Sequence, residues 1–401
     1  MSRRRRTPAH ERGVSRSEVP GEHPSEREPV VTNARIIGAA EIDYERHPAS
    51  ELETSELLAR AARLALEDAG VRPSDVDGFG VSSFTLSPDN CIDLVVRLGL
   101  RVSWMMDARS GGASGIDMLL HAVRAVDAGD ATTIVLVAGD TFRPGDFRTL
   151  VDNYNAATRD HLAPLPFGGP NALFALVTTR HMHRHELSRE DYGRLVIAQR
   201  AWASGNLNAA YRSPLSLDEY LSAEVVADPL CMFDCVPVVA GADAVVVARA
   251  DHGVRVRAIR ALYNADLHDG DGTASGLAEL APALWADSGV QPADVDVALV
   301  YDDYPVMVLV QLDDLGFGEP HETLPRIADR SLPVNTSGGQ LSAGQAGAAG
   351  GMHHLVEAVT QLRGRGGGRQ VKGARLAVVT GYGMVAYRYG ACANAAVLER
   401  E

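Results

Sequence analysis

The chain has 401 residues, of which 46% are hydrophobic and 22% are charged, an ordinary balance for a globular protein. Its formal net charge of −14 argues against non-specific binding to DNA or RNA, which needs a basic face. No apolar run approaches the roughly 20 residues that span a bilayer, and the N-terminus does not resemble a secretory signal peptide. We therefore expect a soluble, cytoplasmic protein without a membrane span, and its four scattered cysteines fit a reducing compartment.

In chain order, residues 1–32 come first and are rich in Arg, Glu, Ser and Pro. Such a segment buries too little apolar surface to offset the entropy of ordering, so we predict a disordered tail. Ordered structure should begin with a strand at about residues 33–40.

An internal repeat is the strongest organisational signal. Residues 68–77 (DAGVRPSDVD) reappear as residues 287–296 (DSGVQPADVD). Each copy should end a helix at glycine, turn through proline and enter an apolar strand, although a common helix-to-strand connection used twice is the alternative. We predict two halves, residues 33–255 and 256–401, with mixed sheets covered by helices.

The segment from about 140 to 225 interrupts the first half. We predict that this insertion is helical around residues 191–204 and supplies ligand-binding loops.

A glycine-rich turn at residues 111–115 precedes a helical pattern over residues 116–123 and is followed by a strand pattern over 132–139. A turn at the start of a buried helix is suited to hold a reactive side chain, because free N–H groups and the helix dipole stabilise negative charge there. The position suited to that side chain is Gly112, which has none.

Metal-binding patterns are weak. Cys231 and Cys235 are four residues apart, and His181 and His185 can share a helix face, but two ligands do not make a site. We therefore predict no metal site.

Four short motifs occur in order along the chain: Gly112-Ala113-Ser114-Gly115; Tyr301-Asp302-Asp303-Tyr304; Asn335-Thr336-Ser337-Gly338-Gly339 with Gln345 beyond it; and Val379-Thr380-Gly381-Tyr382-Gly383. With their spacing, they resemble the thiolase superfamily, in particular its sterol-carrier-type (lipid-transfer) branch. The resemblance covers the chain from about residue 33 to the end. It implies a duplicated thiolase-like α/β fold, layered α/β/α/β/α.

The same resemblance shows which thiolase chemistry the chain has lost. By position, Gly112 replaces the reactive cysteine, Gln345 replaces the histidine and Val379 replaces the second cysteine. Thiolysis through an acyl-cysteine needs a thiolate and groups that move protons, so it is not expected.

The resemblance also implies an alternative chemistry, that of the cysteine-less steroid side-chain aldolases of this branch. They have a Tyr-Asp pair at the second motif and work with a zinc-ribbon/OB-fold partner protein. By analogy we expect aldol-type cleavage or formation of a carbon–carbon bond at a β-hydroxyacyl thioester, in which backbone donors hold the enolate. If nearby groups lower the pKa of Tyr301, its phenol can act as acid or base. The candidate catalytic residues are Tyr301, Asp302 (as an orienting group) and Tyr382; the candidate oxyanion or substrate-binding residues are Gly112, Ala113, Ser114, Asn335, Gln345, Gly381 and Gly383.

Two other functions stay open at this point. One is a thiolase-type acyltransferase with an unusual nucleophile such as Ser114, Ser342 or Cys392. The other is a non-catalytic subunit that binds an acyl-CoA or acts as a scaffold. In each case we expect no cofactor besides coenzyme A as part of the substrate, and the resemblance implies a homodimer.

Overall fold

The computed structural model describes residues 32–49, 51–143, 145–165, 169–265, 270–386 and 389–400. The predicted tail, residues 1–32, lies outside these ranges except for Thr32. No helix in the described part combines the length and the apolar character needed to cross a bilayer.

One nine-stranded mixed sheet runs through the molecule, in the order β3-β2-β4-β7-β1-β8-β11-β10-β9. β2 is parallel to β3 and β4, and β9 is parallel to β10, whereas the other neighbours are antiparallel. The strands are β1 (Ala34–Glu41), β2 (Gly78–Ser82), β3 (Trp104–Asp107), β4 (Thr133–Asp140), β7 (Gly241–Arg249), β8 (Val254–Tyr263), β9 (Val297–Leu299), β10 (Leu376–Ala386) and β11 (Tyr389–Arg400).

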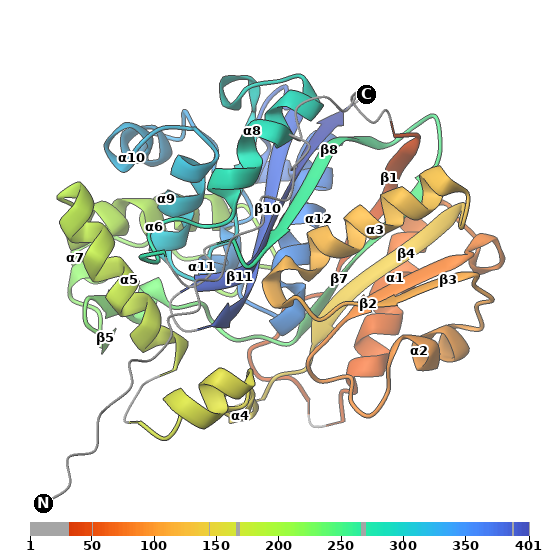
Figure 1. Ribbon diagram of the computed structural model, residues 1–401, viewed down its shortest axis with the longest axis horizontal. Coiled ribbons are helices and arrows are strands. Elements are labelled where there is room, and N and C mark those ends of the chain that lie inside the picture. The colour runs from red at the N-terminus through yellow and green to blue at the C-terminus, as the bar shows by residue number, and fades with distance from the viewer. Residues whose placement is uncertain are drawn as a thin grey trace, which may run out of the picture.

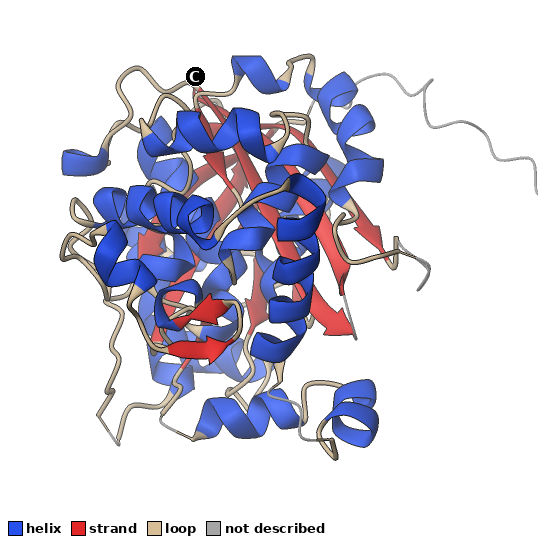
Figure 2. Cartoon of the chain, turned by 90° about the vertical axis from the view of Figure 1, so that its left-hand side faces the viewer, coloured by secondary structure: helices blue, strands red, loops and turns tan. Residues whose placement is uncertain are grey.

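Helices cover both faces of this sheet and also separate its two parts (Figures 1 and 2). The helices α3 (Ser114–Ala128) and α12 (Gly350–Leu362) pack on each other and contact strands of both halves. The outer helices are α1 (Thr54–Ala69) and α2 (Cys91–Leu98) on the first half, and α8 (Leu277–Ser288), α9 (Pro305–Asp314) and α10 (Pro320–Ala328) on the second.

The layered mixed α/β fold is therefore confirmed, with one difference from the separate sheets that we expected. The two halves are joined at β1 and β8, where Arg35 pairs with Arg255 and Ile36 pairs with Val254. This contact is short because the strands then diverge to enclose α3 and α12, whose apolar faces form the central core.

The two copies of the repeat form the same helix–turn–strand unit. α1 ends at Gly70 and α8 at Gly289, which have φ values of 65° and 67° that favour glycine. In each copy the last aspartate then accepts hydrogen bonds from the backbone that leads into a strand: Asp77 from Thr132 and Thr133, and Asp296 from Arg375 and Leu376. Because these hydrogen bonds from backbone N–H groups to aspartate recur at matching places, the repeat in the sequence is also a repeat in the structure.

The insertion forms a helical body beside the second half, at the left of Figure 1. The helix predicted around residues 191–204 is confirmed as α6 (Arg189–Ala203). α6 packs on α9, α10 and α11 (Gly339–Ala343), so the insertion lies against the elements that follow the second copy of the repeat. The other inserted elements are α4 (Asp146–Asp152), a π-helical turn (Thr158–Leu162), α5 (Pro170–His185), α7 (Leu217–Leu221), β5 (Val225–Ala227) and β6 (Leu230–Cys231).

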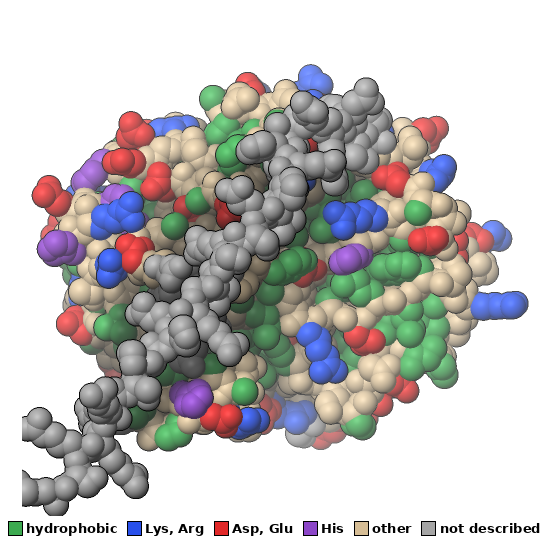
Figure 3. All heavy atoms as spheres, in the orientation of Figure 1, with side chains coloured by type: hydrophobic (Ala, Val, Ile, Leu, Met, Phe, Trp, Pro, Cys, Tyr) green, Lys and Arg blue, Asp and Glu red, His purple; other side chains and the backbone are tan. Residues whose placement is uncertain are grey.

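Charged side chains of both signs are interspersed over the face that Figure 3 shows, without one large area of a single sign. The described side chains visible on this face form no extended basic surface of the kind that binds a phosphate backbone.

Candidate active site

Tyr301 lies just beyond the end of β9, and buried hydrogen bonds fix its backbone. Its N–H donates to Thr380 Oγ1 at 2.9 Å, and its carbonyl accepts from Gln311 Nε2 at 2.5 Å. Thr380 Oγ1 in turn donates to Gln311 Oε1 at 2.6 Å, which closes the triangle. The chain thus leaves the sheet at a defined angle, as a site that positions a side chain requires.

Asn335 fixes the residue before Tyr301. Its Oδ1 accepts from Val300 N at 2.8 Å and its Nδ2 donates to Val300 O at 2.9 Å. The Asn335 amide, which we expected to bind substrate, is therefore paired on both sides with backbone.

The ring of Tyr301 occupies the space that a side chain at position 112 would need. A Cβ at Gly112 would lie 2.1 Å from Cζ and 2.3 Å from Oη of Tyr301, well inside van der Waals contact. Gly112 is buried in the turn that precedes α3, as the sequence pattern indicates. A cysteine at position 112 and a tyrosine at 301 in its present orientation exclude each other.

Tyr301, Asp303 and Gln345 form the polar centre of the site. Gln345 Nε2 donates to Tyr301 Oη at 3.0 Å and to Asp303 Oδ1 at 2.7 Å, and the Tyr301 hydroxyl is hydrogen-bonded to Asp303. Burial raises the pKa of Asp303 to about 7, while the hydrogen bond from Tyr301 opposes this shift and the nearby Asp302 charge adds to it. Asp303 therefore titrates near neutral pH, in the range suited to a general base.

The surroundings do not lower the pKa of Tyr301, so the condition under which its phenol could act as a base is not met. Burial, followed by the charge of Asp303, raises this pKa well above its ordinary value of 10. Tyr301 is consequently a neutral hydrogen-bond and proton donor, and Asp303 is the group that can accept a proton.

Asp302 points away from this trio into the protein. It is fully buried, and its oxygens accept from Gln199 Nε2 at 2.7 Å and from Gln340 N at 2.9 Å. His354 Nε2 lies 3.0 Å from the same carboxylate. These contacts join α6, α11 and α12, which is an arrangement suited to the orienting role that we expected of Asp302.

Other candidate residues lie in β10, which packs against the turn that contains Gly112. Tyr382 is buried, and its hydroxyl accepts a hydrogen bond from Gly390 N. A Cβ at Gly381 would lie 2.9 Å from Ala113 Cα, and one at Gly383 would lie 2.2 Å from Ser110 O, so both glycines permit close approach of β10 to the turn. The expected oxyanion donors Ala113 N–H and Ser114 N–H donate within the turn, to Ser110 O and Gly111 O respectively.

A cavity of about 530 Å³ opens in front of the trio, within the usual size range of small-molecule sites. Its walls come from both halves and from the insertion, and they are largely apolar and aromatic. Gly112, Tyr301, Asp303 and Gln345 line it together with Tyr154, Tyr304, Phe84, Phe147, Leu150, Val151, Leu162, Leu173, Phe174, Val236, Val238 and Val385.

The proposed alternative nucleophiles are not among the described residues that line this cavity. Ser342 Oγ accepts a hydrogen bond from Arg200 Nε at 3.0 Å, and burial raises the pKa of Cys392 to about 11. Cys235 does line the cavity, but burial raises the pKa of its thiol to about 12, so it is a poor source of thiolate.

Sequence reasoning missed Asp303 and Tyr154 as members of the site. In a strand, side chains two residues apart point the same way. If this alternation is continued past the end of β9, it pairs Tyr301 with Asp303 and so could have indicated Asp303 in place of Asp302. Tyr154 lies in the insertion, and its hydroxyl would be 2.7 Å from a Cβ at Gly111. No local pattern marks Tyr154, because only the fold brings the insertion over the glycine turn.

Comparisons with known proteins agree with this architecture. Residues 264–398 match the family model described as thiolase C-terminal domain-like. The chain is 32% identical over 361 residues to the 17-hydroxy-3-oxo-4-pregnene-20-carboxyl-CoA lyase of Mycobacterium tuberculosis, covering 82% of this chain and 92% of that one. It is 27% identical over 368 residues to the steroid side-chain-cleaving aldolase of Thermomonospora curvata, covering 82% and 90%.

Among solved structures, the Ltp2-ChsH2(DUF35) aldolase superposes with a TM-score of 0.78 at 25% identity, covering 92% of this chain and 99% of that chain. The agreement extends over both halves and the insertion, well beyond the segment that the family model matches. The chain therefore belongs to the thiolase superfamily, within the branch that contains the sterol-carrier-type thiolases and the steroid side-chain-cleaving aldolases.

Proposed function

We propose that this protein is a carbon–carbon lyase that cleaves a β-hydroxyacyl-CoA by a retro-aldol reaction without a covalent acyl-enzyme. The observation that carries the proposal is the Tyr301 ring in the space next to Gly112, with Asp303 beside it at the cavity. A tyrosine ring fills the place of a nucleophile, and the base that titrates near neutrality lines the cavity beside it. The names of the relatives, which include a CoA lyase and an aldolase, support the same reaction class.

In the proposed reaction, ionised Asp303 accepts the proton of the substrate's β-hydroxyl group. The Cα–Cβ bond breaks, Cβ becomes a carbonyl carbon, and the bonding electron pair passes to the thioester as an enolate. The enolate is then protonated at Cα, which releases a shortened acyl thioester and an aldehyde or ketone. The proton that Asp303 accepted balances the one that Cα receives.

Tyr301 and Gln345 assist this reaction as neutral donors. Tyr301 keeps its proton because its pKa is raised, so it can donate to the substrate oxygen or relay the proton to Cα. Gln345 Nε2 holds the Tyr301 hydroxyl and the Asp303 carboxylate in one orientation. The amide cannot itself transfer a proton as histidine does, and this mechanism does not require it to.

A zinc-ribbon/OB-fold protein of the DUF35 type is the partner we propose, because the superposed aldolase structure contains ChsH2(DUF35). Its contribution is tested by assaying the chain with and without such a partner.

The decisive experiment incubates the protein, alone and with the partner, with a panel of β-hydroxyacyl-CoAs and identifies the products by mass spectrometry. We expect a shortened acyl-CoA plus a carbonyl compound, and no acyl adduct on the protein. Asp303→Asn should lower kcat by at least about 100-fold, the usual contribution of a general base. Asp152→Asn is the matched control, because Asp152 lines the cavity but is exposed.

Three results would oppose the proposal. Absence of cleavage across the panel contradicts the reaction class, and a trapped acyl-enzyme favours the acyltransferase alternative. Full activity of the complex after both Asp303→Asn and Tyr301→Phe would favour the scaffold alternative.

A further inference from the structure

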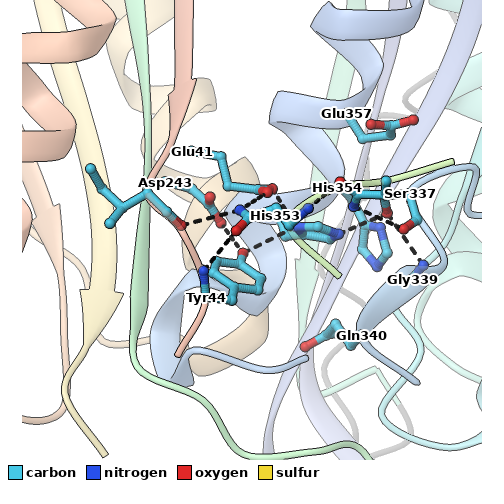
Figure 4. A network of polar contacts seen from close by, with 12 residues as sticks. Glu41, Tyr44, Asp243, Ser337, Gly339, Gln340, His353, His354 and Glu357 are labelled. Carbon is cyan, nitrogen blue, oxygen red and sulfur yellow. Dashed lines mark hydrogen bonds and ion pairs between the residues drawn. The ribbon is translucent and has the colours of Figure 1, made fainter. Parts of the chain in front are cut away.

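Behind the active site, a second buried polar cluster joins the two halves of the molecule. Glu41 is the last residue of β1, Asp243 lies in β7, and His353 lies in α12. One ligand atom from each of the three lies within 4.8 Å of the other two. Figure 4 shows them gathered around Tyr44, between the strands of the first half and α12.

The register of the sheet brings the two carboxylates together. Glu41 is paired directly with Asp243 across the antiparallel strands β1 and β7. Directly opposed like charges destabilise a sheet, and a buried unpaired carboxylate is costly. His353 Nδ1 approaches Glu41 Oε2 to 3.0 Å, so a single imidazole faces two carboxylates.

The outer atom of each of these three groups already has a protein partner. Asn208 Nδ2 donates to Glu41 Oε1, and Tyr44 Oη donates to Asp243 Oδ2 at 2.7 Å. Ser337 Oγ lies 2.7 Å from His353 Nε2. Metal ligands are typically held in this way, with a second hydrogen bond that fixes the orientation and tautomer of each ligand.

On the inner side of the cluster, His353 Nδ1 contacts Glu41 Oε2 and the Tyr44 hydroxyl, each at 3.0 Å. Asp243 is completely buried, and among the described residues its Oδ1 has no hydrogen-bond partner. The separation of 3.0 Å between Glu41 Oε2 and His353 Nδ1 is close to the about 3.3 Å between neighbouring ligands of a tetrahedral ion bound at about 2.0–2.1 Å. A cation bound by this cluster would satisfy the buried Asp243 carboxylate, one oxygen of which has no partner among the described residues.

From this geometry we propose that Glu41, Asp243 and His353 bind one divalent transition-metal cation, with Zn²⁺ as the best match. One imidazole nitrogen and two carboxylate oxygens suit Zn²⁺ better than Mg²⁺, which prefers oxygen ligands and keeps several waters. The Tyr44 hydroxyl lies 3.0 Å from His353 Nδ1 and also donates to Asp243 Oδ2, so a cation would take over the contact with Nδ1 while Tyr44 keeps its bond to Asp243. The ligands are 202 and 110 residues apart in the sequence, which is why no motif indicates this site.

The place of the cluster in the fold assigns the cation a structural role. It would tie β1 and β7 of the first half to α12 of the second. The next residue of α12, His354, contacts Asp302, which precedes the proposed base in the chain. The cation therefore stabilises the wall behind the active site without touching the substrate cavity, whose lining includes none of its three proposed ligands.

The test treats the full-length protein with a chelator, removes the chelator, and then adds Zn²⁺ or Mg²⁺. We expect about one equivalent of Zn²⁺ to be retained, as measured by mass spectrometry of the metal, and a rise in melting temperature that grows with Zn²⁺ concentration. Mg²⁺ should produce neither effect. Asp243→Asn should weaken Zn²⁺ binding at least about tenfold, because it removes one charged ligand.

His185→Gln is the matched control, since the rings of His185 and His181 lie 4.6 Å apart on α5, outside the proposed site. It should retain Zn²⁺ like the wild type. Absence of retained Zn²⁺ in the wild type, or equal retention by Asp243→Asn, would overturn the proposal.

If Asp243→Asn does not fold, Co²⁺ bound to the wild type decides the question by its absorption spectrum. A spectrum of nitrogen and oxygen ligands supports the site, whereas a thiolate charge-transfer band places the ion at the cysteines and overturns it.

Discussion

At the scale of single residues, the site depends on two adjacent side chains with opposite environments. Asp302 is buried among four donors from three helices, whereas Asp303 faces the cavity and accepts from Gln345. Two neighbouring carboxylates thus have different tasks because their surroundings differ, and the charge of one helps to raise the pKa of the other.

The first prediction concerns pH. Because the pKa of Asp303 is raised to about 7, the fraction of ionised base increases as pH rises through neutrality. We expect kcat/KM to increase with pH, to reach half its maximum near pH 7, and to level off above pH 8, since Tyr301 stays protonated there. A profile already flat from pH 5 to 8 would show that Asp303 is not the base.

The same shift has a consequence for stability. A carboxyl whose folded-state pKa lies above its unfolded value destabilises the fold as pH rises from about 4 to 7, because the unfolded chain releases the proton first. Asp303→Asn should therefore raise the melting temperature relative to wild type more at pH 8 than at pH 5, even though it strongly lowers kcat. This opposite effect on stability and activity distinguishes loss of the base from loss of the fold.

The second residue-scale prediction concerns Gly112. In Gly112→Ala the new Cβ would overlap the Tyr301 ring, so the ring must move out of its present position. We expect activity to fall at least about tenfold and the free energy of unfolding to drop by about 1–3 kcal/mol, as for other overpacked sites. Urea unfolding measures the second effect.

A double variant provides the control for Gly112. In Gly112→Ala/Tyr301→Ala the ring is absent, so the added methyl group should cost much less stability than it does alone. Equal costs in both backgrounds would mean that the ring and the methyl group do not compete for one space.

At the scale of elements, the helices and strands could be predicted well and their side-chain connections could not. The repeat at 68–77 and 287–296 indicated both helix ends, because glycine, proline and aspartate act on the backbone within a few residues of themselves. The triangle of Tyr301, Gln311 and Thr380 could not be foreseen, because its members come from elements that meet only in the folded sheet.

The same difference explains the candidate site. Gly112, Tyr301 and Gln345 were found because motif spacing aligns them with known positions, and all three line the cavity. Motif reasoning emphasised Asp302, whose buried role depends on Gln199 and His354 in other helices. The spacing of the motifs thus identified which positions lie at the cavity. The roles of the residues there depend on side-chain direction and burial, which the spacing does not give.

At the scale of the whole molecule, the edges of the sheet determine how copies can assemble. β9 ends one edge and β3 ends the other, and within the described residues the outer side of β3 pairs with no strand. An open edge exposes unpaired N–H and C=O groups that can pair with a second sheet. Met105 in the middle of β3 is 47% exposed, which adds an apolar surface to this edge.

The expected homodimer is the last prediction, and β3 is the contact that we expect for it. Two copies related by a twofold axis can align their β3 strands antiparallel and continue the sheet from one protomer into the other. Met105→Lys should then convert the dimer to a monomer, because a charge on an edge strand opposes such pairing. Light scattering coupled to size-exclusion chromatography measures the mass directly.

Leu207→Lys is the control, since Leu207 is 82% exposed but lies outside the sheet. A wild-type monomer, or a Met105→Lys variant that stays dimeric, would exclude this contact. Because the cavity lining includes neither residue, the monomeric variant should also show whether cleavage requires the pair or each protomer acts alone.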